Sequence, residues 1–97
     1  MALLTQTQIS AALNELKQWT NLNGKLHREY TFPYFAHAIG FMATAALHIE
    51  KNNHHPEWSN VYNRVSVTLR THDAGNHVTE LDVTLARLLD TYSNALC

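Results

Sequence analysis

Two segments in which apolar and polar residues alternate constrain the fold of this chain more than any other feature. The alternation covers residues 26–32 and again residues 65–70, and a two-residue period is typical of strands that bury one face. Each segment follows a shorter strand-like segment, residues 19–22 and 58–61, with turn-forming residues between the two. The sequence therefore predicts two pairs of strands.

Segments with helical periodicity precede, separate and follow these two pairs of strands. Apolar residues recur at the i, i+3 and i+4 spacing of an amphipathic helix in residues 5–19, 33–52 and 79–96. Thr5 or Thr7 can cap the first of these helices. The resulting order, α-β-β-α-β-β-α, favours an α+β fold of two layers, a four-stranded antiparallel sheet with the helices packed on one face.

The length of the chain favours self-association. Its 97 residues predict a single domain, residues 1–97, and a domain of this size buries only roughly 60–65% of the surface that its unfolded form exposes. A four-stranded sheet also has two edges that must be paired or covered. We therefore expect a homodimer formed by edge pairing, or a homotetramer to which helix faces that include Phe41, Leu47 and the last helix contribute.

Charge and cysteine content argue against several classes of protein. Seven Lys and Arg residues against eight Asp and Glu residues give a formal charge of −1, and without a basic stripe we expect no direct binding of nucleic acid. The only cysteine, Cys97, cannot form a disulfide within the chain, so we expect a reducing, cytoplasmic location. We expect no signal peptide, and the longest apolar stretch, residues 35–47, is too short to span a membrane.

Three of the seven histidines are placed to share a cleft. His54 and His55 follow the second predicted helix, directly before Pro56, and His72 follows the last predicted strand. If the strands between them pair as a hairpin, His72 returns close to the other two histidines. An imidazole has a pKa near 6.5 and can donate or accept a proton at neutral pH, which suits an elimination or a hydration that needs no nucleophile.

A metal site is the main alternative for three histidines, and the sequence disfavours it. Neighbouring residues in an extended chain point to opposite sides, so His54 and His55 do not readily bind one ion together. Nucleophilic catalysis also lacks support, because Cys97 is terminal and no serine lies in a nucleophile-elbow sequence. Arg28 lies in the apolar phase of its strand, which either a snorkelling side chain or an anion contact explains.

The histidines belong to a longer pattern. It comprises Glu50, His54-His55-Pro56-Glu57-Trp58, Asn60-Val61-Tyr62-Asn63, Val65, Leu69, Thr71-His72-Asp73 and Asp82. In this pattern the chain resembles the pterin-4a-carbinolamine dehydratase family. The similarity extends over almost the whole chain, through Trp19, Arg28 with Tyr30 and Phe32, and Gly40-Phe41-Met42. Residues 75–78 depart from the family pattern, which has Gly-Gly and one residue fewer there.

The resemblance implies a hydro-lyase that removes water from a 4a-hydroxytetrahydropterin to give a quinonoid dihydropterin, in the recycling of tetrahydrobiopterin. An acid for the leaving hydroxide and a base for the N5 proton suffice for this reaction, so we expect neither a metal nor a cofactor. The family pattern implies general-acid roles for His54 and His72, and a substrate-holding role for His55.

Four further residues are candidates for the substrate site. The backbone of Thr71 and the ring of Trp19 are candidates for holding the edge of the pterin and covering its face. The carboxylates of Asp73 and Glu50 are candidates for orienting an imidazole by accepting its second N–H.

A function of another class remains as the alternative. Members of this family in animals also act as dimerisation cofactors of a homeodomain transcription factor, so the resemblance also implies a binding module on the same fold. A binding-only role does not need all three histidines. Their joint presence therefore favours catalysis.

Overall fold

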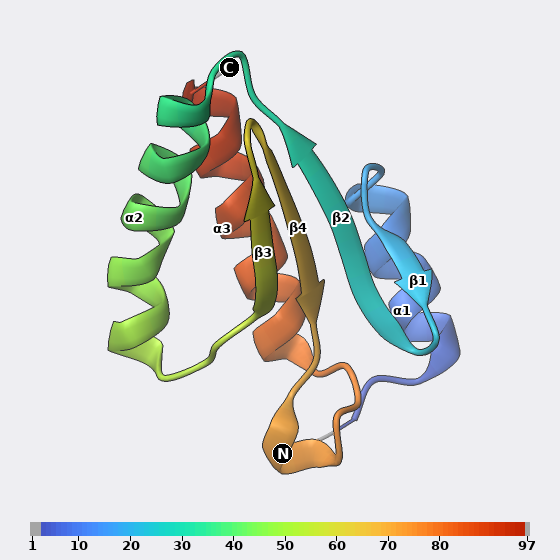
Figure 1. The fold of residues 1–97 in the computed structure, drawn as a ribbon. Coiled ribbons are helices and arrows are strands. Elements are labelled where there is room, and N and C mark those ends of the chain that lie inside the picture. The colour runs from blue at the N-terminus through green and yellow to red at the C-terminus, as the bar shows by residue number, and fades with distance from the viewer. Residues whose placement is uncertain (1–2, 97) are drawn as a thin grey trace.

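The computed structural model describes residues 3–96, so Cys97 lies outside the described residues. The elements are α1 (Gln6–Glu15), β1 (Thr20–Leu22), β2 (Lys25–Thr31), α2 (Phe35–Asn52), β3 (Glu57–Val61), β4 (Arg64–Leu69), the 3-10 helix η1 (His72–Ala74) and α3 (Glu80–Leu96). The helices cover one face of the sheet (Figure 1), and the predicted α-β-β-α-β-β-α order is confirmed. Within the described residues, no helix combines the length and apolar character needed to cross a bilayer.

The four strands form one antiparallel sheet in the order β1-β2-β4-β3. The central strands β2 and β4 pair from Leu26 opposite Leu69 to Thr31 opposite Arg64. β3 and β4 form the predicted hairpin, and Tyr62 in its turn has a left-handed backbone with a φ of 55°. The short β1 and the longer β3 are the two edges of the sheet.

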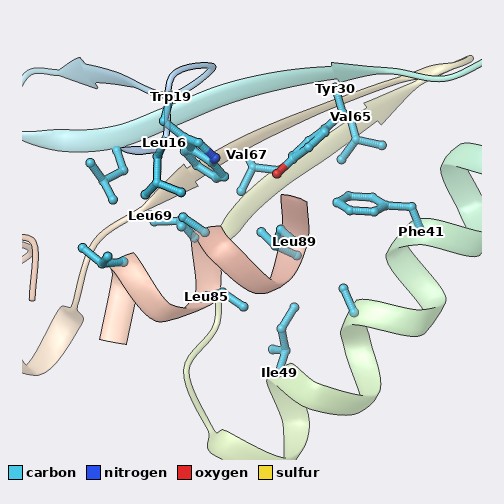
Figure 2. Packing of buried hydrophobic residues seen from close by; sticks show 14 of the residues in the cluster. Leu16, Trp19, Tyr30, Phe41, Ile49, Val65, Val67, Leu69, Leu85 and Leu89 are labelled. Carbon is cyan, nitrogen blue, oxygen red and sulfur yellow. The ribbon is translucent and has the colours of Figure 1, made fainter. Parts of the chain in front are cut away.

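The inward-facing side chains of the central strands form the core with α2 and α3. Figure 2 shows Tyr30, Val65, Val67 and Leu69 of the sheet beside Phe41 and Ile49 of α2 and Leu85 and Leu89 of α3. Phe41 was expected at an interface between copies, and that expectation is wrong because its side chain is fully buried. Its ring packs against Tyr30 and Phe32 with centroid distances of 4.8 and 5.1 Å.

The first helix begins as predicted and ends earlier. Gln8 donates its N–H to the Thr5 hydroxyl, and the Gln8 side chain accepts the N–H of Thr5, which is the reciprocal arrangement of a capping box. The predicted end near residue 19 is wrong, because the helix ends at Glu15 and Leu16 leaves the helical conformation. The turn that follows allows both Leu16 and Trp19 to be buried.

A polar cluster joins β2 to α3 and explains Arg28. Oδ1 of Asp90 accepts hydrogen bonds from Arg28 at 2.6 Å, from the Tyr30 hydroxyl at 2.5 Å and from the Trp19 indole at 3.0 Å. The guanidinium also lies over the Tyr30 ring, 4.1 Å from its centroid. Of the two explanations for an arginine in the apolar phase of a strand, the structure supports the anion contact. Burial, together with Asp90, raises the pKa of the Tyr30 hydroxyl well above its usual range.

Candidate active site

The two adjacent histidines lie just beyond the end of α2. Asn53 ends the helix in the left-handed conformation, at a φ of 49° and a ψ of 42°, which asparagine adopts more readily than most residues. The N–H of His54 bonds back to the carbonyl of Ile49 at 3.4 Å, and Pro56 favours an extended backbone at His55. The chain therefore leaves the helix and carries both imidazoles into the connection before β3.

His72 reaches the same end of the sheet from the other half of the chain. It is the first residue of η1, just after β4, and the α2–β3 and β4–α3 connections both lie at the lower end of the sheet in Figure 1. An isolated bridge, in which Thr71 donates its N–H to the His77 carbonyl at 2.9 Å, closes the loop that departs from the family pattern. Gly75 and Asn76 in that loop both have a positive φ.

One cavity brings the three histidines together. His54, His55 and His72 line a cavity of about 490 Å³, with Thr71 and Asp73 also in its wall. Its other walls come from Asn52, Asn53, Pro56, Arg70 and Leu81. The His54 side chain is only 11% exposed, whereas His55 and His72 are exposed. Three groups able to transfer protons thus share a concave site of the size that binds small molecules.

A buried carboxylate orients His54. Its Nε2 lies 2.8 Å from Oδ1 of Asp82, which is fully buried. Oδ2 of Asp82 accepts the Thr71 hydroxyl at 2.8 Å and the Thr79 N–H at 2.9 Å. Because a carboxylate only accepts hydrogen bonds, Nε2 of His54 is the donor in this pair. Nδ1 is then the nitrogen that remains for a ligand.

The two threonine hydroxyls extend this network. Because Thr71 donates to Asp82, its oxygen accepts the Thr79 hydroxyl at 2.7 Å. Thr79 in turn accepts the N–H of Leu81 at 3.3 Å. The Thr79 hydroxyl therefore donates to the Thr71 hydroxyl, which donates to Asp82. This chain of hydrogen bonds ends at the carboxylate that also accepts from His54.

The backbone of Thr71 does not fit its predicted role. Its N–H is bonded to His77, and its carbonyl accepts the N–H groups of Ala74 at 3.1 Å and Asn76 at 3.0 Å. With its donor and acceptor used inside the loop, this backbone does not offer a free edge for a pterin. Thr71 contributes to the site through its hydroxyl.

Two other predicted residues lie away from the cavity. Trp19 is 3% exposed, and Figure 2 shows its ring beside Leu16 in the core, so it cannot cover the face of a ligand. Glu50 is exposed in the last turn of α2 and does not line the cavity. Within residues 3–96, no cluster of His, Cys, Asp or Glu side chains has the arrangement of a metal site.

Asp82 takes the orienting role that was predicted for Asp73 or Glu50. Its position three residues after Thr79 indicates helix capping, and it does accept the Thr79 N–H. The only other signal in the sequence is its place in the family pattern. Arg70 and Leu81, which also line the cavity, have no comparable signal.

Comparison with known proteins identifies the family of this chain. Residues 2–92 match the family described as pterin 4 alpha carbinolamine dehydratase. The chain belongs to this family. Relatives named provisionally as pterin-4-alpha-carbinolamine dehydratases include one from Solibacter usitatus, 56% identical over 87 residues, which are 90% of each chain, and one from Opitutus terrae, 50% identical over 91 residues, which are 94% of each chain. Family membership and the names of these relatives confirm the predicted enzyme class, a hydro-lyase.

A crystal structure of a related protein has the same fold. It is the transcriptional coactivator/pterin dehydratase from Brucella melitensis, which matches with a TM-score of 0.90 and 45% sequence identity. The match covers 95% of this chain and 99% of that chain. The predicted two-layer α+β fold is therefore that of a pterin dehydratase.

Proposed function

We propose that this chain dehydrates a 4a-hydroxytetrahydropterin to the quinonoid dihydropterin in the cytoplasm, as a step in the recycling of tetrahydrobiopterin. The observation that carries this proposal is the cavity in which three imidazoles meet, one of them held by the buried Asp82. Family membership and the names of the relatives support the same reaction.

The reaction requires only the movement of protons and one bond cleavage. The C4a–O bond breaks, and a proton delivered to the leaving hydroxide makes water. The N5–H bond loses its proton, and its electron pair forms the N5=C4a double bond. No electron is gained or lost, so an acid and a base within hydrogen-bond reach of the two atoms are sufficient.

His54 is suited to either proton transfer. When neutral, it carries its proton on Nε2 towards Asp82 and can accept a proton at Nδ1. When protonated, it is a cation beside a buried carboxylate, and it can donate the Nδ1 proton to a leaving hydroxide. His72 lies in the wall of the same cavity and provides the second acid in this proposal.

His55 and Asp73 are proposed to hold the substrate. Both are exposed residues in the wall of the histidine cavity, so their polar atoms are available to a ligand. An imidazole can donate to or accept from the pterin ring, and a carboxylate can accept the N–H groups of its pyrimidine edge. Neither residue is held by a buried hydrogen-bond network as His54 is. This difference favours a role in substrate contact over a role in proton transfer.

A binding function is the second candidate, and one surface favours it. Phe35, Ile39 and Leu47 of α2 are exposed apolar residues, with Leu47 77% exposed, and exposed apolar patches are typical of protein interfaces. The related protein from Brucella melitensis is named a transcriptional coactivator as well as a pterin dehydratase. We propose that this surface mediates self-association of the chain into a homodimer or homotetramer.

The test of the proposed reaction is 4a-carbinolamine dehydration by histidine variants. Replacing His54 or His72 by alanine is expected to lower kcat by ~10²-fold, the lower end of general acid–base contributions, because the other acid remains. The double variant is expected to lose far more. His55→Ala is expected to raise KM, as the loss of a ground-state contact does.

His27→Ala is the matched control, because His27 lies on β2 and bonds to Thr68, away from the cavity. Thermal unfolding of each variant separates loss of chemistry from loss of folded protein. Full activity in a folded His54→Ala, His72→Ala double variant would contradict the acid–base assignment. A binding module would then be the better explanation.

A further inference from the structure

Leu81 is an exposed apolar residue in a cavity whose walls are otherwise mostly polar. Of the residues within 3–96 that line the histidine cavity, only Pro56 and Leu81 are apolar. Leu81 is 40% exposed, whereas Pro56 is half-buried. Small-molecule pockets combine apolar contact surface with a few placed polar groups. The largest exposed apolar surface in this cavity is therefore that of Leu81.

The position of Leu81 is fixed relative to the imidazole of His54. Leu81 donates its N–H to the Thr79 hydroxyl at 3.3 Å. The next residue, Asp82, is fully buried, and its carboxylate accepts from His54 at 2.8 Å. A shift of this backbone would break hydrogen bonds of a buried carboxylate, which is costly. The first turn of α3 thus holds an apolar side chain and the orienting carboxylate of His54 in one rigid unit.

A pterin ring requires apolar contact in addition to hydrogen bonds. Its carbonyl oxygen and its nitrogens lie on the edge of the ring, and the 4a-hydroxyl is at the ring junction. The two faces of the pyrimidine half therefore carry no hydrogen-bonding group. A polar side chain placed over such a face would lose its water without gaining a partner. Imidazoles, amides and Asp73 in the wall of the cavity suit the edge, and Leu81 suits a face.

We propose that Leu81 packs against a face of the pyrimidine half of the pterin, the covering role that the sequence predicted for Trp19. This inference rests on the proposed function. Trp19 is buried in the core and cannot take the role. The pyrimidine half keeps its ring structure while the C4a–O bond breaks, so Leu81 contacts substrate and transition state alike. Such uniform binding lowers KM and leaves kcat unchanged.

Leu81→Asn tests the contact, because it replaces the apolar end of the side chain by an amide of similar size. Fluorescence titration with two stable oxidised pterins, biopterin and 6-methylpterin, measures binding without any reaction. The variant is expected to raise the Kd of both by ~10-fold, the order that a few apolar carbon atoms contribute in a ligand pocket. Leu81→Met keeps the volume and apolar character and is expected to stay within ~2-fold of the wild type.

Two further measurements separate this contact from a structural role. In dehydration of the 4a-carbinolamine, Leu81→Asn is expected to raise KM by ~10-fold and to leave kcat within ~2-fold of the wild type. Nitrogen NMR is expected to find the proton of His54 still on Nε2 in the variant. Leu22→Asn is the matched control, because Leu22 is 46% exposed on β1 and does not line the histidine cavity. It is expected to bind both pterins as the wild type does.

Several results would overturn the assignment of Leu81. An unchanged Kd in a folded Leu81→Asn would show that this residue does not touch the ring. A rise in Kd for only one of the two pterins would assign the contact to the C6 substituent, and a lost His54 tautomer would make the effect indirect. If the wild type binds both pterins without dehydrating the carbinolamine, the proposed reaction is wrong, and a ~10-fold rise in both Kd values still supports the contact.

Discussion

At the scale of single residues, Asp82 connects the stability of the fold to the chemistry of the site. A fully buried carboxylate is costly unless hydrogen bonds replace its hydration. Asp82 receives three such bonds, from His54, Thr71 and the backbone of Thr79. Removing its charge therefore affects both the start of α3 and the imidazole at the cavity.

Asp82→Asn tests the orienting role. An amide cannot accept at both of its polar atoms, so either His54 or the donors at Oδ2 lose an acceptor. We expect kcat for dehydration to fall by ~10–100-fold, as for other residues that orient a functional histidine, and the free energy of unfolding to fall by ~1–3 kcal/mol. Nitrogen NMR of His54 is expected to show that Nε2 carries the proton in the wild type and that this preference is lost in the variant.

Asp90→Asn is the control for this effect. Asp90 is also a carboxylate with several donors, but these come from the cluster between β2 and α3. Its replacement is expected to lower stability without changing the His54 tautomer. An unchanged tautomer in Asp82→Asn would contradict the orienting role.

At the scale of elements, the contact between β2 and α3 depends on a hydroxyl that must stay neutral. Tyr30 is buried, and its hydroxyl donates to Asp90. Burial and the neighbouring carboxylate raise its pKa in the folded state well above the ordinary value of 10.0. Above pH 10 the unfolded chain releases this proton and the folded chain retains it, so the free energy of unfolding falls as the pH rises.

Tyr30→Phe isolates this contribution. At neutral pH the variant is expected to be less stable by ~1 kcal/mol, because Asp90 loses a hydrogen bond. Above pH 10 the free energy of unfolding is expected to decline less steeply in the variant than in the wild type. The two slopes are expected to differ by up to about 1.4 kcal/mol for each pH unit. Urea unfolding between pH 7 and pH 11 measures both slopes, and parallel curves would contradict the assignment.

At the scale of the whole molecule, the surfaces left uncovered favour association. The edge strand β3 ends at Val61, which is 61% exposed, and the outer side of α2 exposes Leu47. Contact with a second copy pairs the backbone groups of an exposed strand edge and removes an apolar helix surface from water, and both changes favour association.

Leu47→Glu is expected to lower the oligomeric state by placing a charge in that contact. Ser10→Glu, at an exposed position of α1, is the control and is expected to leave it unchanged. Light scattering at tens of micromolar protein measures the mass of each. A wild-type chain that scatters as a monomer at this concentration would remove the proposal of self-association.

The helices and strands, and the approach of His54 to His72, follow from local sequence patterns. Period-two alternation identifies β2 and β4 because a strand presents successive side chains to opposite faces. Thr5 and the Asn53–Pro56 segment mark helix ends through local backbone preferences. A hairpin between His54 and His72 necessarily returns the chain to its starting end, so these two residues could be placed together without coordinates.

Which side chains meet in the interior depends on long-range packing, which local sequence patterns do not contain. Asp82, and not Glu50, accepts the hydrogen bond of His54 because the start of α3 packs against the end of α2. The buried indole N–H of Trp19 likewise depends on an acceptor 71 residues away, Asp90. Phe41 and Leu47 lie on one amphipathic helix, but only the former faces the sheet. Periodicity is a local property of the backbone, whereas the desolvation of a polar or apolar group depends on residues that are distant in sequence.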